Sequence, residues 1–300
     1  MNVKIIVLIL PSKLKVHSAL FFVTLLYGAN YSIAKIALPQ YLEPFGFIVI
    51  RITAAAALFW VFSIWSDHEK IKSRKDLFLL ILCSLFGVGM NQMLFFKGLS
   101  LTNPINASVI MTTSPIMVLF VAYLLGKERI TLMKGLGVLV AAIGAYLLVT
   151  KDGISMSEGT FLGDIFILLN GASYAIYLVL VKPLMMKYKP ITVIKWIFLF
   201  GIFCSFPFGY QELLEVDWRT IPHEAWLSIG YVVIGSTFTV YLLNAWSLQF
   251  VNSSVVGIYI YLQPVISTLV AISFRGDLLE TSTVIYSLLI MSGVYLVSKN

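Results

Sequence analysis

Charged residues are scarce in this chain. Only 12% of its 300 residues are Asp, Glu, Lys or Arg, whereas roughly 25% is usual for a soluble domain. Hydrophobic residues make up 59%, and the mean hydropathy is +0.93. A soluble fold cannot cover that much apolar surface with polar side chains, so the surface must face hydrocarbon. The shortage of charge therefore excludes a soluble protein and indicates an integral membrane protein.

Residues that form metal centres and phosphate-binding loops are also few. Cys83 and Cys204 both lie in apolar stretches, which excludes a disulfide framework. No His-Glu-x-x-His sequence occurs, so we expect neither a metal nor a cofactor. Gly126-Lys127 lacks the preceding glycine and the Ser or Thr of a phosphate-binding loop. These absences disfavour a membrane-embedded enzyme and an ATP-driven pump.

The apolar residues form long, unbroken runs without the period-2 alternation of barrel strands. A helical span needs about 20 such residues, which predicts an all-α integral membrane protein with ten transmembrane helices. We expect them at 16–36, 44–65, 76–98, 103–125, 131–150, 161–181, 190–210, 225–249, 253–274 and 281–298. The predicted parts are a cytoplasmic N-terminal segment (1–15), a first five-helix repeat (16–150), a connecting loop (151–160) and a second five-helix repeat (161–300).

Lysine and arginine are unevenly distributed between the loops on the two sides. With the N-terminus inside, fourteen lie in inner segments and five in outer ones. Because cytoplasmic loops retain positive charge, both termini are predicted to be cytoplasmic, in a multi-pass protein of the cell (plasma) membrane. The net charge of +7 is spread over several loops, so it reflects topology and not a nucleic-acid partner.

An internal repeat links the two halves. Sliding the chain over itself by 149 residues pairs Asn103 with Asn252, Pro115 with Pro264, Gly144 with Gly293 and Tyr146 with Tyr295. Since each predicted repeat has five spans, an odd number, the second copy must lie inverted relative to the first. Inverted repeats of this kind are typical of secondary transporters.

At these residues the sequence resembles the drug/metabolite transporter superfamily, specifically proteins with two tandem EamA-type domains. The features that carry the resemblance are Tyr27-Gly28-Ala29-Asn30, Arg51, Ser114-Pro115, the stretch 126–131, Gly137 and Gly144. The similarity covers residues 17–299, although Gly276-Asp277 replaces Lys127-Glu128 in the second copy. The resemblance implies a ten-helix carrier that moves metabolites, amino acids or drugs by alternating access, often outward.

Two prolines, Pro115 and Pro264, are expected near the middle of the fourth and ninth spans. Each removes a backbone donor and loosens the carbonyl four residues earlier, at Met111 and Ile260. Within the membrane, backbone groups freed in this way need hydrogen-bond partners from other parts of the protein or from a water-filled cavity. Matching breaks therefore indicate a central binding site; simple helix kinks are the alternative interpretation.

Polar and aromatic side chains near these breaks and in other spans are expected to converge on a shared interior, because unpaired polar groups are costly in hydrocarbon. Hydrogen bonding between helices, without cargo, is the alternative for each of them. Aromatic and amide walls suit a mid-sized organic solute. The substrate-binding candidates are Tyr27, Asn30, Tyr31, Arg51, Asn91, Gln92, Thr113, Ser114, Asn170, Tyr174, Tyr177, Tyr241, Asn244, Tyr259 and Gln263, with helix breaks at Pro115 and Pro264.

Two charged residues have competing interpretations. Arg51 lies about 10 Å inside the second span, where it either binds a carboxylate or phosphate of the cargo or extends to the lipid headgroups. Glu128 precedes the fifth span, where it either caps that helix or relays protons. Small residues at 137, 141 and 145 form a packing stripe that joins helices within one chain or between two, so monomer and homodimer both stay open.

These features together favour a secondary, alternating-access carrier of small organic metabolites in the lipid bilayer, an exporter of amino acids, related metabolites or drugs. A passive channel or facilitator for small polar solutes is the alternative. Against a channel, the sequence has no ring of like charges and no carbonyl-filter sequence.

Overall fold

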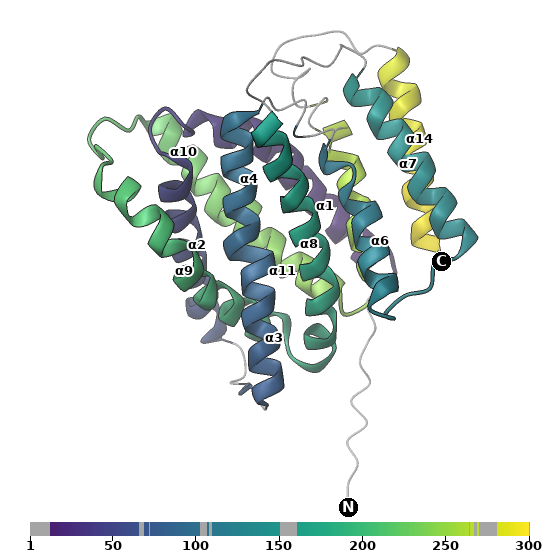
Figure 1. The fold of residues 1–300 in the computed structure, drawn as a ribbon, viewed down its shortest axis with the longest axis horizontal. Coiled ribbons are helices and arrows are strands. Elements are labelled where there is room, and N and C mark those ends of the chain that lie inside the picture. The colour runs from purple at the N-terminus through teal and green to yellow at the C-terminus, as the bar shows by residue number, and fades with distance from the viewer. Residues whose placement is uncertain are drawn as a thin grey trace, which may run out of the picture.

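The computed structural model describes residues 13–65, 69–71, 73–102, 107, 110–150, 161–263, 265–266, 269 and 281–299, and these form helices and turns without a strand (Figure 1). The first half contains α1 (Lys13–Ile33), η1 (Ala34–Ile36), α2 (Pro44–Ser63), α3 (Arg74–Ser84), η2 (Leu85–Gly89), α4 (Met90–Leu101), α6 (Ser114–Leu124) and α7 (Leu132–Thr150). The second contains α8 (Phe161–Lys187), α9 (Pro190–Leu214), α10 (His223–Gly230), η3 (Tyr231–Thr239), α11 (Val240–Ser247), α12 (Ser253–Ile258), η4 (Tyr259–Tyr261) and α14 (Thr281–Lys299).

Six helical runs in the described part are long and apolar enough to cross a bilayer: Lys13–Ile36, Pro44–Ser63, Arg74–Leu101, Phe161–Lys187, Pro190–Leu214 and His223–Ser247. Shorter apolar helices, Ser114–Leu124, Leu132–Gly144 and Val284–Val297, fall within three further expected spans. The expected ninth span begins with α12 and η4. Parts of 103–109 and 264–280 lie outside the described residues, so the number of ten stays a prediction.

Some helix boundaries differ from the expected ones. Helix α8 runs to Lys187, beyond the expected end at 181. Its Lys182 ammonium donates to the main-chain carbonyls of Leu248 and Val251, so this lysine is bonded within the helical bundle and not in a loop. Helices α2 and α9 both begin with proline, which suits the first turn because its missing N–H has no partner there.

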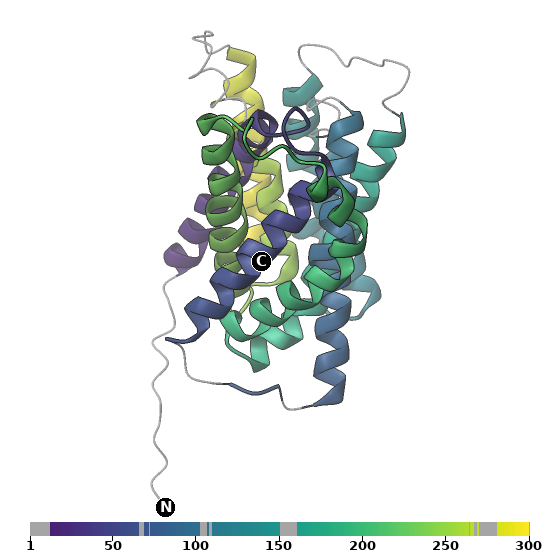
Figure 2. The same ribbon diagram turned by 90° about the vertical axis from the view of Figure 1, so that its left-hand side faces the viewer.

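Helices pair across the two halves of the chain. Helix α2 packs on α9, α4 on α8, α1 on α11, α6 on α12, and α7 on α14. Numbered as the expected spans, these pairs are 2 with 7, 3 with 6, 1 with 8, 4 with 9 and 5 with 10. If each span is replaced by its counterpart in the other half, the same five pairs result. Figure 1 shows α7 and α14 side by side at one edge of the bundle, and Figure 2 shows the helices from the side.

Matching glycines allow the first helix of each half to approach the other half closely. A Cβ added to Gly28 of α1 would lie 2.7 Å from Ile266 and 3.3 Å from the Gln263 oxygen. A Cβ added to Gly171 of α8 would lie 2.6 Å from Ser114 Oγ and 3.7 Å from Met117 Sδ. Positions 114 and 263 are 149 residues apart, as are 117 and 266. The two glycines therefore make equivalent contacts.

The small-residue stripe of α7 faces α14 of the same chain. A Cβ on Gly137 would lie 2.9 Å from the Gly293 oxygen, and one on Gly293 would lie 2.6 Å from Ala141. Backbones that approach this closely exclude larger residues. The stripe therefore joins the two halves within one chain, which is one of the two interpretations left open by the sequence.

The segments expected as the third and eighth spans each contain a π-helical segment, η2 and η3 respectively. At their ends the amide of Met90 bonds to the carbonyl of Leu85, and that of Val240 to that of Gly235. A bond over five residues widens the helix and releases carbonyls from the ordinary ladder, and such segments frequently occur at functional sites.

Candidate functional site

A cavity lies between the two halves at the level of the π-helices. It measures about 80 Å³, well below the roughly 300–1,000 Å³ of pockets that bury a drug-sized ligand. A mid-sized solute therefore fits only if helices or side chains move apart. The lining residues are Tyr27, Asn30, Arg51, Asn91, Gln92, Phe95, Phe96, Met111, Asn170, Tyr174, Tyr241, Ile260 and Gln263.

Arg51 places a cation in this cavity. Its residue surface is only 5% exposed, so it does not extend to the headgroups, which was one of the two interpretations from the sequence. Its Nε donates to Thr237 Oγ1 at 2.5 Å and its Nη2 to the Ser236 carbonyl at 3.3 Å, while Cζ lies 5.2 Å from the centre of the Phe96 ring. These partners are neutral, and no described carboxylate pairs with Arg51. A buried cation without a counterion is costly.

Both π-helices offer a main-chain carbonyl to a cavity side chain. The Tyr241 hydroxyl donates to the Gly87 carbonyl of η2 at 2.7 Å, just as Arg51 donates to Ser236 of η3. Gly87 and Ser236 are 149 residues apart. The two halves thus use matching carbonyls to hold two different polar side chains at the cavity wall.

Amide side chains cross between the halves at the same level. Gln92 Nε2 donates to the Tyr241 hydroxyl at 3.2 Å, and these two residues are themselves 149 positions apart. Asn91 and Asn170 exchange side-chain to main-chain hydrogen bonds at 3.1 and 2.8 Å. The Oε1 atom of Gln92 is buried without a hydrogen-bond partner in the described part of the chain. An unsatisfied buried acceptor suits a ligand that brings a donor.

Nine of the fifteen substrate-binding candidates are among the described residues that line the cavity. Tyr177 lies just behind the wall, with its ring centroid 6.1 Å from Tyr174 and 6.3 Å from Tyr241. The Tyr259 hydroxyl bonds His17 Nδ1 at 2.8 Å, away from the cavity. Ser114, Thr113 and Asn244 do not line it, and the side chain of Tyr31 lies outside the described residues.

Four apolar residues among the described lining were not predicted, because the prediction rested on polar side chains and tyrosines. Met111 and Ile260 precede the two prolines by four positions and are 149 residues apart. Phe95 and Phe96 follow Asn91 and Gln92 by four positions, which places them on the same helix face. The four-residue spacing from the prolines and from the amides could therefore have predicted all four lining residues.

Pro115 lies at the start of a helix, whereas a simple kink would place it in the middle of a continuous one. A turn at Thr112 and Thr113 precedes α6, and Pro115 occupies its first turn. Proline is tolerated there because that N–H has no helical partner. Pro115 is buried within the protein. Pro264 lies outside the described residues.

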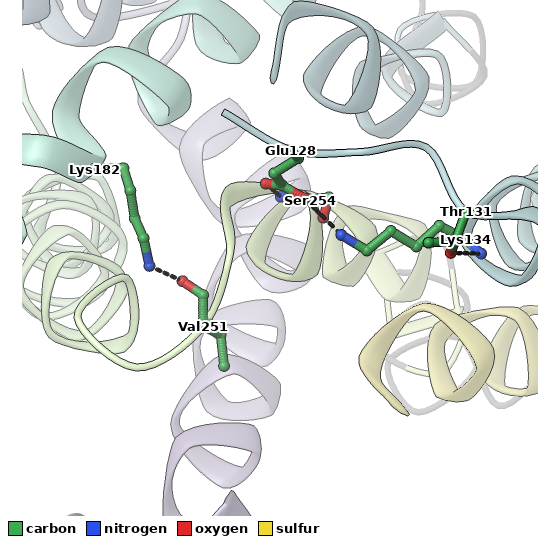
Figure 3. Close-up of polar contacts among 6 residues, drawn as sticks. All are labelled: Glu128, Thr131, Lys134, Lys182, Val251 and Ser254. Atoms are coloured by element: carbon green, nitrogen blue, oxygen red, sulfur yellow. Dashed lines mark hydrogen bonds and ion pairs between the residues drawn. The ribbon is translucent and has the colours of Figure 1, made fainter. Parts of the chain in front are cut away.

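Glu128 does not cap the fifth span, contrary to the expectation from its position. Its carboxylate accepts hydrogen bonds from Ser254 N at 3.1 Å and Ser254 Oγ at 2.5 Å, at the start of α12 in the other half. It also pairs with Lys134 at 2.8 Å, and both side chains are 5% exposed. The cap of α7 is Thr131, whose Oγ1 accepts from Lys134 N at 3.2 Å. Figure 3 shows this arrangement, which we call the Glu128 cluster (Glu128, Lys134 and Ser254).

Comparisons with known proteins agree with this architecture. Residues 14–150 and 161–299 each match the family described as the EamA-like transporter family. The chain therefore belongs to this family and contains two copies of its domain. It is a membrane transporter of the drug/metabolite transporter type. The family and its named relatives indicate a transporter and not an enzyme.

Three relatives span almost the whole chain. An uncharacterized transporter of Archaeoglobus fulgidus is 26% identical over 94% of this chain and 96% of its own. The uncharacterized transporter YyaM of Bacillus subtilis is 23% identical over 94% of this chain and 92% of its own. A WAT1-related protein of Arabidopsis thaliana is 22% identical over 96% of this chain and 86% of its own. A crystal structure with 18% identity has a TM-score of 0.76 and covers 94% of this chain and 96% of that one, a likeness of fold alone.

Proposed function

We propose that this member of the EamA-like transporter family is a secondary carrier that moves small organic solutes by alternating access. The cargo class is amino acids, related metabolites or drugs that carry a carboxylate or another anionic group, and the direction is outward. The protein crosses the plasma membrane ten times as two inverted repeats, with both termini in the cytoplasm. The observation that carries this proposal is the buried Arg51 guanidinium, which lines a central cavity without a carboxylate partner among the described residues.

The chemistry of the cavity supports an anionic cargo. A guanidinium has five N–H donors, of which two are bonded to Thr237 and Ser236. A carboxylate accepts two parallel hydrogen bonds from this group and supplies the missing charge. Gln92 Oε1 offers an acceptor for an N–H or O–H of the same solute, and the tyrosine rings flank its apolar part.

The symmetry of the contacts supports alternating access. Matching positions from both halves meet at the cavity, as in the Gln92–Tyr241 pair and in Met111 with Ile260. A site at the interface of two related halves can open to either side when one bundle rocks against the other. The small cavity volume fits a contracted conformation from which such opening starts.

Counterflow in proteoliposomes tests the transport mechanism. Candidate cargo is first found by thermal shift of the purified protein with amino acids, nucleosides, organic acids and cationic drugs, because bound cargo raises apparent stability. We expect anionic or zwitterionic compounds to stabilise it. Vesicles preloaded with unlabelled cargo should then transiently accumulate labelled cargo with saturable kinetics. Flux that is linear in concentration, without accumulation against the gradient, would show a channel.

A further inference from the structure

A second hollow lies at the opposite end of the second span from Pro44. It is a groove of about 540 Å³ between the end of α2, the start of α3 and the first turns of α9. Its lining includes Trp60, Glu69, Lys70, Arg74, Lys195 and Trp196, none of which belongs to the central cavity. The distribution of Lys and Arg predicts this end to be cytoplasmic.

The groove carries an excess of positive charge. Among the described residues, the groove is lined by three cations, Lys70, Arg74 and Lys195, and by one carboxylate, Glu69. The Oε2 atom of Glu69 already accepts a hydrogen bond from the Lys189 amide at 2.9 Å. Arg74 is the first residue of α3, so the positive end of that helix dipole faces the same region. The groove is therefore suited to an anion.

Lys195 is held in place for such a role. It is half-buried in the second turn of α9, and its Nζ lies 4.7 Å from the Trp60 ring centre and 3.4 Å from Ser63 Oγ. No described carboxylate lies within ion-pair distance of it. A cation over an indole face is stabilised by the ring, but it keeps its charge available to a ligand.

The apolar surroundings point to a ligand with an acyl part. The ring centroids of Trp60 and Trp196 lie 5.5 Å apart in an edge-to-face pair, and both rings line the groove. Trp65, which follows α2, and Phe78 of α3 are 78% and 63% exposed. Tryptophan is enriched at the level of lipid headgroups. A soluble anion would gain nothing from these rings, whereas a lipid places its chains along them and its phosphate near the cations.

We propose that this groove is a binding site for the headgroup of an anionic phospholipid. Basic pockets between transmembrane helices on the cytoplasmic side bind anionic headgroups by the same combination of charge and depth. The site is separate from the cargo cavity, and the proposal holds or fails independently of the transported solute.

Native mass spectrometry of the full chain in detergent tests the proposal, because single lipid molecules are counted without a membrane surface potential. The protein is titrated with phosphatidylglycerol, phosphatidylcholine or inorganic phosphate. We expect phosphatidylglycerol to bind preferentially, and Lys195→Gln and Arg74→Gln each to weaken it about fivefold. Lys195→Arg keeps the charge and should keep binding.

Lys75→Gln is the matched control, since Lys75 is exposed on the same helix turn but does not line the groove. It should leave binding unchanged. Equal binding of the two lipids, or an equal loss in Lys75→Gln, would overturn the proposal. Displacement of the lipid by equimolar inorganic phosphate would identify a soluble-anion site and also overturn it. Gel filtration of each variant confirms that a loss of binding does not come from misfolding.

Discussion

Two buried cations in this protein have opposite surroundings. Lys134, 4% exposed, pairs with Glu128 at 2.8 Å in the Glu128 cluster. Arg51, 5% exposed, contacts a hydroxyl, a carbonyl and an aromatic ring, and no carboxylate in the described part of the chain pairs with it. A buried charge with an oppositely charged partner is compensated within the fold, so removing one partner lowers the stability of the protein. An unpaired one is costly to the fold and is retained where a ligand supplies the opposite charge.

The largest expected effect is on the paired side of this comparison. Glu128→Gln leaves Lys134 buried without its carboxylate and should lower the unfolding free energy by about 3–5 kcal/mol. Thermal unfolding in detergent measures it. Adding Lys134→Met should restore most of the loss, because the double variant has no unpaired charge left in the Glu128 cluster. Asp76→Asn is the control: its partner Lys187 is 45% exposed, so the loss should stay below about 1 kcal/mol.

On the unpaired side, Arg51→Gln should weaken transport of an anionic cargo about 10- to 100-fold, which corresponds to a lost charge-assisted hydrogen bond. Stability should be unchanged or higher, because an uncompensated cation is removed. Counterflow and thermal unfolding on the same samples separate the two effects. Lys97→Gln, at a half-buried cation outside the cavity, should transport normally. Unaltered affinity of the Arg51 variant would exclude the ligand role.

A smaller effect is expected where the cavity wall is packed. A Cβ on Gly87 would lie 2.3 Å from the Tyr177 ring, so Gly87→Ala should displace that ring and cost about 1–3 kcal/mol. Gly135→Ala, in α7, has nothing within 4 Å and should be neutral or stabilising. Equal melting temperatures for the two variants would contradict the close packing described for η2.

The smallest effect concerns the hydrogen bonds across the halves. Tyr241→Phe removes the hydroxyl that donates to Gly87 and accepts from Gln92, and should cost about 1 kcal/mol. Tyr210→Phe, at an exposed tyrosine of α9, is the control. A cost no greater at position 241 than at 210 would mean that this bond does not contribute.

Much of the helical layout follows from hydropathy alone, because each span must be apolar over the bilayer thickness. The π-helices η2 and η3 do not follow from hydropathy, because a hydrogen bond to the fifth preceding residue depends on what packs beside the helix. At η2, for example, the Tyr177 ring packs against Gly87. The C-terminal end of α8 was also predicted too early, because Lys182 finds carbonyl partners within the bundle.

The candidate site was predictable where spacing carries the signal. Polar residues expected to converge from several spans, such as Asn91, Gln92 and Gln263, do line one cavity, whereas Thr113 and Ser114 at the first break do not. The surroundings of Arg51 were not predictable, because depth in a span does not tell which way a side chain turns. Glu128 was assigned to the neighbouring helix, but the chain turns at Gly126, with φ of 62°, and the carboxylate reaches Ser254 more than a hundred residues away. Contacts of that kind depend on tertiary packing.

The central claim is that the cavity between the halves opens in turn to both faces of the membrane. Met111→Cys and Ile260→Cys, one in each half and each in a background without Cys83 and Cys204, can be labelled with an impermeant maleimide in vesicles of either orientation. Ile116→Cys, at a 47% exposed position of α6, is the lipid-facing control. Both cavity cysteines should react from either side and be protected by cargo. Reaction from one side only, or from neither, would contradict alternating access.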